Sequence, residues 1–422
     1  MRCERLTLAA DPAAAVAQLR ALVPAADSVQ EVVGEIIGAV RSHGDQAVGE
    51  YTQRLDTAGA PPAALIVTDA ELDRAAQLLD PSVRAGLQRA IENVSAVASA
   101  GCGGSREIPV DLGDHVVLLH KVPVASAAVY VPGGRAPYPS TVVMGVVCAR
   151  AAGVQDIAVC SPPGLEGDVD PVVLGACRLA GASVVYRMGG AQAIAALAFG
   201  TGTVRRVDVI VGPGNLYVQE AKRQVFGQVG IDGFAGPSDL VVIADADADS
   251  QELALDLLAQ AEHGPGTLVV GASWSQELLA VLAKRIAGAP DTGAVACLVE
   301  VADSEQALAF AQAFAPEHLQ LVGARAETLA PRASSAGCLF VGRASGTAFG
   351  DYVAGSNHIL PTGGAARFQS ALSPEHFRRG FAEVRIGEAG ELARAGAPVA
   401  RAEGFELHAR SMEARIRDNG RR

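Results

Sequence analysis

Eight histidines occur in the chain, and several of them stand beside other side chains that can bind a metal ion or move a proton. In the stretch LLAQAEHG, Gln260 and His263 are three residues apart near the end of a predicted helix, so they share one face of it. In APEHLQ, Glu317 and His318 are adjacent where a helix gives way to a strand. Because histidine titrates near neutral pH, this second pair brings two proton-transfer groups to one place.

Two further histidines stand closer to the C-terminus. Asp351 and His358 lie in GDYVAGSNHILPTGG, a loop too rich in glycine to form a helix. Glu403 and His408 lie in AEGFELH, where they also fit a solvated helix face. Taken singly, a histidine at a helix end is commonly a cap or a surface residue, and an aspartate in a glycine-rich loop is commonly a turn former. The histidines that we leave in this plain category are His43, His115, His120 and His376.

A metal site is one hypothesis for these side chains taken together. Glutamine, aspartate and histidine supply the nitrogen and oxygen ligands that suit zinc or a similar divalent ion. Their wide spacing along the chain matches no local metal motif such as HExxH. The residues alone therefore leave the metal site and the plain interpretations both open.

The elements that position these residues follow from the apolar pattern. Residues 28–56 and 69–100 repeat apolar side chains with a period near 3.6, which predicts helices, and CGGS at 102–105 predicts a break. From about residue 120, four short apolar runs alternate with helical stretches, which is typical of a parallel, doubly wound sheet. After a loop at 229–239, a second series of this kind predicts a second parallel sheet. Past residue 365 the pattern fades into a polar tail.

Glycine-rich segments mark the expected ligand side of this fold. Ligands bind beyond the carboxyl ends of parallel strands, and we expect those ends to carry VPGG, RMGGAQ, GPGN and FAGPS. Glycine lets the backbone approach a ligand closely, yet GxGxxG is missing, and the segments also fit plain turns. Two α/β units in one chain predict a cleft between them.

Composition limits the partners. The 422 residues suffice for two to four domains at roughly 100 to 200 residues each. A net charge of -12 and an aromatic content of 4% argue against nucleic acid. No apolar run reaches the roughly 18 residues that span a bilayer, and Asp11 and Pro12 interrupt the stretch that a signal peptide would need. Seven scattered cysteines without a CxxC pair favour free thiols and a cytoplasmic location.

Several long segments resemble those of one enzyme family. They are VYVPGGRAPYPSTVVM, GGAQAIAALAFGT, GPGNLYVQEAKRQVFG, LLAQAEHG, APEHLQL and GDYVAGSNHILPTGGAARF. These segments come in the same order as in the histidinol dehydrogenase family, and the similarity runs from about residue 28 to the C-terminus. The resemblance implies an enzyme of histidine biosynthesis that oxidises L-histidinol to L-histidine through an aldehyde, with two NAD+ and one bound zinc ion per subunit.

The resemblance also implies a role for each candidate residue. It makes His318 the general base that takes the alcohol proton, and Glu317 the group that activates water for the second oxidation. The implied zinc ligands are Gln260, His263, Asp351 and His408. The implied substrate contacts are Ser238, His318 and Glu403, together with the zinc ligands, and the implied NAD contacts are Tyr130, Gln192 and Asn215.

The expected fold is α/β, with two Rossmann-like domains built on parallel doubly wound sheets. We expect residues 28–107 with 237–365 to form the first domain, which carries the metal and catalytic residues, and 108–236 to form the second, on the NAD side. Residues 1–27 and 366–422 are expected to be extensions. In the family that is resembled, the tail crosses to a partner subunit, so Glu403 and His408 would complete the other site of a homodimer.

Three residues depart from the family pattern. Asp239 stands where the family usually has glutamate, Ala259 stands where it usually has serine, and Arg187 before MGG is unusual. These departures leave open a relative that oxidises another small polar alcohol with NAD. A non-catalytic binding protein with a cleft is a third hypothesis. The paired Glu317 and His318 weigh against it, because binding alone needs no acid and base.

Overall fold

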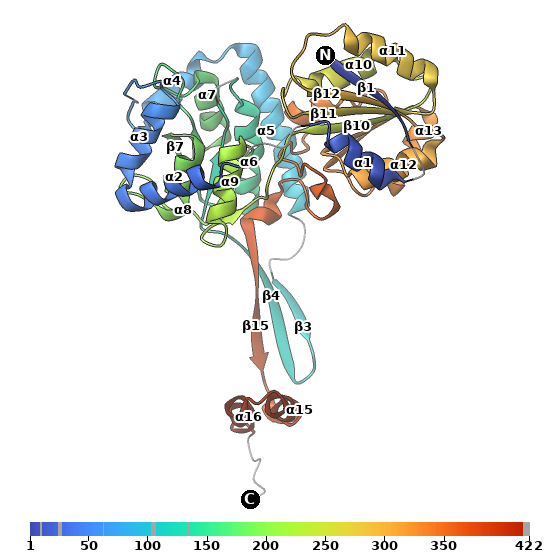
Figure 1. Ribbon diagram of the computed structural model, residues 1–422. Coiled ribbons are helices and arrows are strands. Elements are labelled where there is room, and N and C mark those ends of the chain that lie inside the picture. Colours follow the sequence, from blue (N-terminus) through green and yellow to red (C-terminus); the bar gives the residue numbers. More distant parts are fainter. Residues whose placement is uncertain (9–10, 24–27, 62, 103–106, 134–135, 417–422) are drawn as a thin grey trace, which may run out of the picture. The chain divides into compact units, whose positions relative to one another are not determined.

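The computed structural model describes the chain except residues 9–10, 24–27, 62, 103–106, 134–135 and 417–422. The chain divides into two compact units (Figure 1). The main unit comprises Met1–Cys102 and Val124–Phe377, and the tail unit comprises Gly103–Pro123 and Arg378–Arg422. Within the described ranges, no helix is both long and apolar enough to cross a membrane.

The first sheet of the main unit has the strand order β2-β7-β6-β5-β8-β9. Its strands are β2 (Ile66–Val67), β5 (Ser126–Tyr130), β6 (Asp156–Ser161), β7 (Val184–Arg187), β8 (Val209–Val211) and β9 (Gly230–Ile231). The helices between them are α6 (Pro139–Ala152), α7 (Pro171–Ala180), α8 (Gly190–Phe199) and α9 (Leu216–Val225). β2 runs antiparallel to β7, and the other ladders are parallel. The order reverses between β5 and β8, so the carboxyl ends of these strands frame a ligand position.

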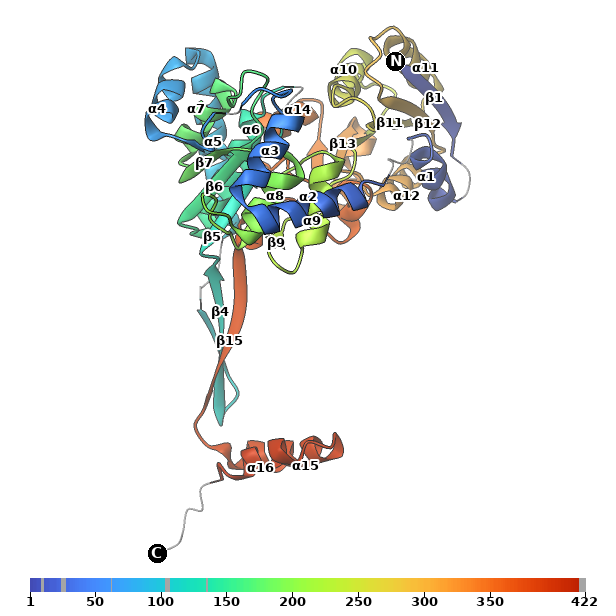
Figure 2. The same ribbon diagram turned by 60° about the vertical axis from the view of Figure 1, so that its left-hand side comes forward.

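The N-terminal helices pack on this first sheet. They are α2 (Gln30–His43), α3 (Asp45–Leu55), α4 (Asp69–Leu78) and α5 (Pro81–Gly101). α2 and α3 contact α8, α4 contacts α7, and α5 contacts α6 (Figure 2). The expected grouping of 28–107 with 237–365 therefore differs from the observed packing. An amphipathic helix shows in its sequence that one face is buried, but not which sheet that face covers.

The second sheet of the main unit is parallel throughout its described ladders, with the order β1-β12-β11-β10-β13-β14. Its strands are β1 (Arg2–Thr7), β10 (Asp239–Ala244), β11 (Leu268–Ser273), β12 (Val295–Glu300), β13 (His318–Val322) and β14 (Cys338–Val341). The α-helices of this part are α1 (Pro12–Arg20), α10 (Ser250–Ala261), α11 (Gln276–Ala287), α12 (Ser304–Phe314), α13 (Ala324–Glu327) and α14 (Thr347–Tyr352), and the 3-10 turns of the main unit are η1 (Ala330–Arg332), η2 (Ala365–Arg367) and η3 (Pro374–Phe377).

Both sheets have the apolar strands that a two-sided covering of helices requires. All residues of β10 and β11 are buried. β1, which the sequence analysis assigned to an N-terminal extension, pairs with β12 and so completes an edge of the second sheet. The predicted fold class, α/β with parallel doubly wound sheets, is confirmed by this topology.

The tail unit is an antiparallel sheet followed by two helices. β3 (Glu107–Asp111), β4 (His115–Pro123) and β15 (Arg378–Ile386) pair in the order β15-β4-β3. The helices α15 (Ala389–Ala402) and α16 (Glu406–Glu413) pack on each other. The expectation that residues 108–123 belong to the second α/β domain is wrong, because β4 pairs with β15 along its whole length. More than 250 residues separate the two strands in the sequence, so no local pattern connects them.

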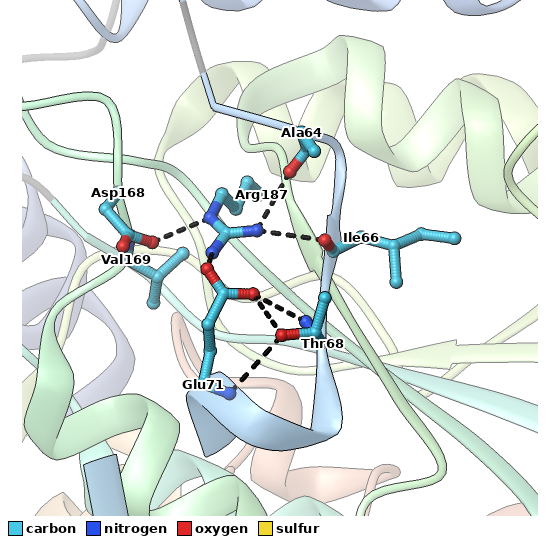
Figure 3. Close-up of polar contacts among 7 residues, drawn as sticks. All are labelled: Ala64, Ile66, Thr68, Glu71, Asp168, Val169 and Arg187. Carbon is cyan, nitrogen blue, oxygen red and sulfur yellow. Dashed lines mark hydrogen bonds and ion pairs between the residues drawn. The ribbon is translucent and has the colours of Figure 1, made fainter. Parts of the chain in front are cut away.

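Arg187, the unusual residue before MGG, lies at the end of β7 and is 2% exposed. Figure 3 shows its guanidinium group at the centre of a polar cluster. Nε donates to Asp168 at 2.7 Å, and Nη2 donates to Glu71 at 2.7 Å. Nη1 donates to the carbonyl oxygens of Ala64 and Ile66, at 2.9 and 3.0 Å. Arg187 therefore fastens the short edge strand β2 and the start of α4 to β7.

Candidate active site

The main unit contains a cavity of about 600 Å³, which has the size of a small-molecule site. Sequence-predicted residues that line it are Asn215, Ser238, His263, Glu317, His318 and Asp351. Gln260 joins them, because its Nε2 donates to Ser238 Oγ at 2.5 Å. The structure thus brings most of the predicted candidates to one place.

The two sheets present opposite strand ends to this cavity. From the first sheet come Pro132 and the turn Gly212–Asn215, which follow β5 and β8 at their carboxyl ends as expected. From the second sheet come Ser238, directly before β10, and Glu317 and His318, where β13 begins. FAGPS therefore lies at an amino end, against the expectation. The segment RMGGAQ supplies no residue to the described lining.

Ser238, Asp239 and Glu317 are joined by reciprocal hydrogen bonds between the starts of β10 and β13. The Glu317 carboxylate accepts from the Ser238 hydroxyl and from the Asp239 N–H, the latter at 3.1 Å. In return, Asp239 Oδ1 accepts from the Glu317 N–H at 2.6 Å. Burial raises the pKa of Glu317 to about 7, with Asp239 adding to the rise and His318 opposing it. Glu317 can therefore exchange a proton near neutral pH.

His318 is 3% exposed and lies between two carboxylates. Its Nδ1 is 3.8 Å from Glu317 Oε2, and its Nε2 is 3.5 Å from Asp351 Oδ1. Burial by itself would lower the pKa of His318, but the carboxylates raise it to about 8. Its Nδ1 is buried without a hydrogen-bond partner among the described residues. A buried nitrogen of this kind is commonly reserved for a ligand or a reacting group.

The predicted metal ligands are only partly assembled. Burial lowers the pKa of His263, so this histidine is in the neutral form that binds metals. Asp351 lies in α14, against the expectation of a loop at this residue, and its carbonyl oxygen is 2.8 Å from Nδ1 of His358, which also lines the cavity. Across the part of the chain that the structure describes, no cluster of three or more His, Cys, Asp or Glu is arranged to hold a metal. The nitrogen and oxygen donors of Gln260, His263 and Asp351 suit zinc chemically. The fourth predicted ligand, His408, belongs to the tail unit and not to the unit that contains the cavity.

Comparison with known proteins agrees with this geometry. A family model described as histidinol dehydrogenase matches residues 22–416. The chain belongs to the histidinol dehydrogenase family. A histidinol dehydrogenase from Parasynechococcus marenigrum is 44% identical over 409 residues, which cover 92% of this chain and 91% of the relative. One from Pseudomonas aeruginosa is 42% identical over 407 residues, which cover 93% of this chain and 92% of the relative.

A solved structure supports the same family. The crystal structure of histidinol dehydrogenase from Elizabethkingia anophelis is 29% identical to this chain. It matches with a TM-score of 0.88 and covers 98% of both chains. The resemblance that the sequence motifs carried is thereby confirmed.

The residues that the histidinol dehydrogenase resemblance assigns to NAD lie in the first sheet or in the helices next to it, because Tyr130 ends β5, Gln192 lies in α8 and Asn215 precedes α9. Asn215 caps α9 by accepting from the Val218 N–H at 3.1 Å, and it lines the cavity. The Tyr130 hydroxyl accepts from the Gly190 N–H at 3.1 Å. Gln192 is fully buried, and its Oε1 has no hydrogen-bond partner in the described part of the chain. Tyr130 and Gln192 thus lie at the same glycine turn, outside the described cavity lining, and their NAD role stays a prediction.

Two residues assigned by the family resemblance lie in the tail unit. Glu403 follows α15 as its C-cap, and its side chain is exposed. His408 lies in α16, is also exposed, and has its ring 5.2 Å from that of Phe405. The chain itself thus does not bring them together with the cavity residues in one compact unit.

The polar side chains of the described cavity wall that sequence reasoning missed include Gln219, Lys222 and Asp232. Gln219 and Lys222 lie on α9, and both are buried. The available signal was their spacing of three residues in a helix that follows GPGN, which places them on one face. Polar residues at helical spacing usually mark a solvated face, so the sequence alone gave no reason to single them out.

Proposed function

We propose that this chain oxidises L-histidinol to L-histidine through histidinaldehyde, with two NAD+ reduced to two NADH. The observation that carries the proposal is the buried pair Glu317 and His318 at the wall of one cavity. Two successive oxidations at one carbon release protons in both steps, so two proton acceptors are needed beside it. The biosynthetic role follows from family membership. The cytoplasmic location stays a prediction, which the free thiols support.

His318 acts in the first oxidation. In its neutral form, which a pKa of about 8 makes the major form only above about pH 8, it would take the hydroxyl proton of histidinol as the carbon gives up a hydride to NAD+, because hydride leaves an alkoxide more easily than an alcohol. The partnerless Nδ1 supports this role, since a nitrogen without a protein partner is available to substrate. Asp351, 3.5 Å from Nε2, holds the ring in orientation.

Glu317 acts in the second oxidation. It takes a proton from water as the water adds to the aldehyde, and the resulting hydrate gives a second hydride to NAD+. The bonds from Ser238 and Asp239 orient the carboxylate toward one position. A pKa raised to about 7 by burial makes Glu317 a stronger base than an exposed glutamate, because basicity rises with pKa.

Zinc and NAD belong to the proposal as cofactors. Gln260, His263 and Asp351 would hold the zinc ion, together with His408 of a second subunit. When bound, zinc supplies a positive centre for the amine and imidazole nitrogens of the substrate. Asn215, Tyr130 and Gln192 would hold NAD. Metal analysis of purified protein should give about one zinc per subunit, and His263→Ala should remove it.

A homodimer with shared sites is the proposed assembly. The tail unit supports it, because its sheet and helices expose large apolar side chains that water does not favour. These side chains are Ile108, Val110, Leu112, Leu119, Phe381, Val384, Ile386, Val399, Phe405 and Leu407. A second copy of the chain would cover them and would bring Glu403 and His408 to the other subunit's cavity.

One assay tests the activity. The protein is mixed with L-histidinol, NAD+ and zinc, and NADH absorbance is followed to completion. Two NADH per histidinol are expected. Turnover with a different small alcohol alone would support a paralogue, and no turnover with any alcohol would support a binding protein.

Two variants test the roles of the proton acceptors. His318→Asn should nearly abolish turnover with the zinc content unchanged, and loss of zinc would contradict the assigned role. Glu317→Gln should slow aldehyde oxidation more than alcohol oxidation. An equal effect on the two steps would refute the division of labour between the two residues.

Hybrid dimers test the shared site. Mixing the subunits of inactive His318→Asn and inactive His408→Ala creates hybrids that contain one intact site if the tail crosses over. Activity should then return, up to about half of the wild-type value per hybrid dimer. If each site is built from a single chain, the mixture stays inactive.

A further inference from the structure

We propose that Lys222 and Asp232 form a buried positioning pair that holds the Gly212–Asn215 turn in the conformation that NAD binding requires. The inference rests on the proposed function, because it assigns the turn to NAD. Lys222 lies in α9 and Asp232 follows β9, and their side chains are 1% and 7% exposed. Both residues line the cavity.

The pair binds both polar groups of Gly212. Lys222 Nζ donates to the Gly212 carbonyl oxygen at 2.7 Å and to Asp232 Oδ1 at 2.5 Å. Asp232 Oδ2 accepts from the Gly212 N–H at 2.7 Å. The ammonium and the carboxylate thus close a ring around one backbone residue, which fixes the position of that residue between β8 and α9.

Position 212 has no room for a side chain, and its backbone conformation favours glycine. Its φ of +118° lies in the region that favours glycine, and a Cβ at this position would come within 2.1 Å of the Tyr130 carbonyl oxygen. The turn is therefore pressed against the end of β5, and the ion pair holds it there. Tyr130, one of the three residues proposed to hold NAD, makes this contact, and Asn215, another of them, follows Gly212 by three residues.

A second side chain of α9 extends the same arrangement. Gln219 lies three residues before Lys222, so the two share a helix face. Gln219 Nε2 donates to the Gly214 carbonyl oxygen at 3.4 Å, and its Oε1 accepts from the Ala235 N–H at 2.9 Å. One face of α9 therefore binds both the turn at 212–214 and the loop at 232–235, which leads to Ser238.

Stability alone does not account for a buried ion pair at this place. Removing two charges from water costs about as much as their attraction returns, so an apolar pair of similar volume is often equally stable. The pair differs from an apolar one in that it can bind the N–H and the carbonyl of Gly212 at once. We therefore assign it to the geometry of the turn, where a shift of about 1 Å is enough to impair a reaction.

The test uses the full-length, zinc-loaded enzyme and compares Lys222→Met with the double variant Lys222→Met/Asp232→Leu. Lys222→Met leaves a buried carboxylate unpaired and is expected to lower the melting temperature. The double variant removes both charges and is expected to recover the melting temperature. In both variants the KM for NAD+ should rise about tenfold or more, with the KM for histidinol changed by less than about twofold. Lys284→Met, at an exposed position on α11, is the matched control and should change neither KM.

The outcomes separate the possible explanations. A double variant with a wild-type KM for NAD+ overturns the proposal, and so does a parallel rise of both KM values. If Lys222→Met does not fold, Gln219→Leu tests the same helix face, with an expected rise of about threefold in the KM for NAD+ and an unchanged KM for histidinol. An unchanged KM for NAD+ in that variant also overturns the proposal. If the wild-type protein itself fails to oxidise histidinol with NAD+, the proposed function fails instead.

Discussion

Replacement of Arg187 by methionine is expected to loosen the β2 segment and to leave the cavity chemistry intact. Methionine keeps most of the length of the side chain and removes every donor. The lost bonds are those to Asp168, Glu71 and the carbonyl oxygens of Ala64 and Ile66 (Figure 3). None of these partners lines the described cavity, so kcat should stay within about twofold of the wild-type value at 25 °C.

The free energy lost in Arg187→Met depends on how exposed the partners of the Arg187 guanidinium are. The two carbonyl bonds are worth about 1 kcal/mol each. The carboxylates of Asp168 and Glu71 are 50% and 44% exposed, so water screens these ion pairs and they are worth about 0.5–1 kcal/mol each. The apolar methionine side chain returns about 1 kcal/mol by burial. The net loss is about 2–3 kcal/mol.

Hydrogen–deuterium exchange is the assay, because the lost hydrogen bonds should destabilise one local segment and this method measures local opening. β2 pairs with β7 over only two residues, and the Arg187 N–H donates to the Leu65 carbonyl oxygen next to it at 2.8 Å. A loss of 2–3 kcal/mol should speed exchange in the 64–71 segment by about 30- to 150-fold.

Arg178→Met is the control for this experiment. Arg178 also pairs with α4, through Asp73 at 2.7 Å, but its side chain is 45% exposed. Its removal should cost under about 1 kcal/mol and change exchange by less than about fivefold. Equal exchange rates in the two variants would refute the reasoning, because burial would then not decide the strength of these contacts.

Three further predictions concern buried or partly buried polar groups. Burial raises the pKa of Asp56 to about 6, so the folded chain binds the carboxyl proton more tightly than the unfolded chain does. The free energy of unfolding should therefore fall as the pH rises from about 4 to 6. Asp56→Asn should therefore raise the melting temperature more at pH 8 than at pH 4, and an equal change at both values would contradict the burial argument. Asp239→Asn replaces a carboxylate that accepts from the Glu317 N–H, and it should slow aldehyde oxidation about tenfold more than alcohol oxidation in single-turnover measurements. Equal slowing of both steps would mean that Asp239 does not act through Glu317. Tyr130→Phe removes the acceptor of the Gly190 N–H and should lower the free energy of unfolding by about 1–2 kcal/mol, as measured by denaturant titration; a stable variant would show that water replaces the hydroxyl.

Much of the local structure was predictable from short stretches of sequence. The apolar runs after residue 120 were predicted as strands, and β5, β6, β7 and β8 occupy them. The helices at 28–56 and 69–100 also form, each as two helices, with breaks at Gly44 and at Asp80 before Pro81. Glycine and proline act on their own backbone, so such breaks are encoded locally.

The sequence predicted which residues form the candidate site better than it predicted where on the sheets they lie. Motif order named Ser238, Glu317, His318 and Asp351, and the structure gathers them at one cavity. Their position at the amino ends of β10 and β13 was not predictable, because the general rule for parallel sheets points to the opposite ends.

The amino-acid sequence by itself determined the alternation of strands and helices and the chemical types at the site, because these depend on near neighbours and on side-chain identity. Only the tertiary structure decided which sheet the N-terminal helices cover, that β15 pairs with β4, and that Arg187 and Lys222 are buried among acceptors. Except at Lys222, whose acceptors Gly212 and Asp232 are ten residues away, each of these outcomes joins residues far apart in the chain. These outcomes depend on the requirement that every buried charge and every apolar face has a partner in the folded chain. A local sequence pattern does not show which residue that partner is.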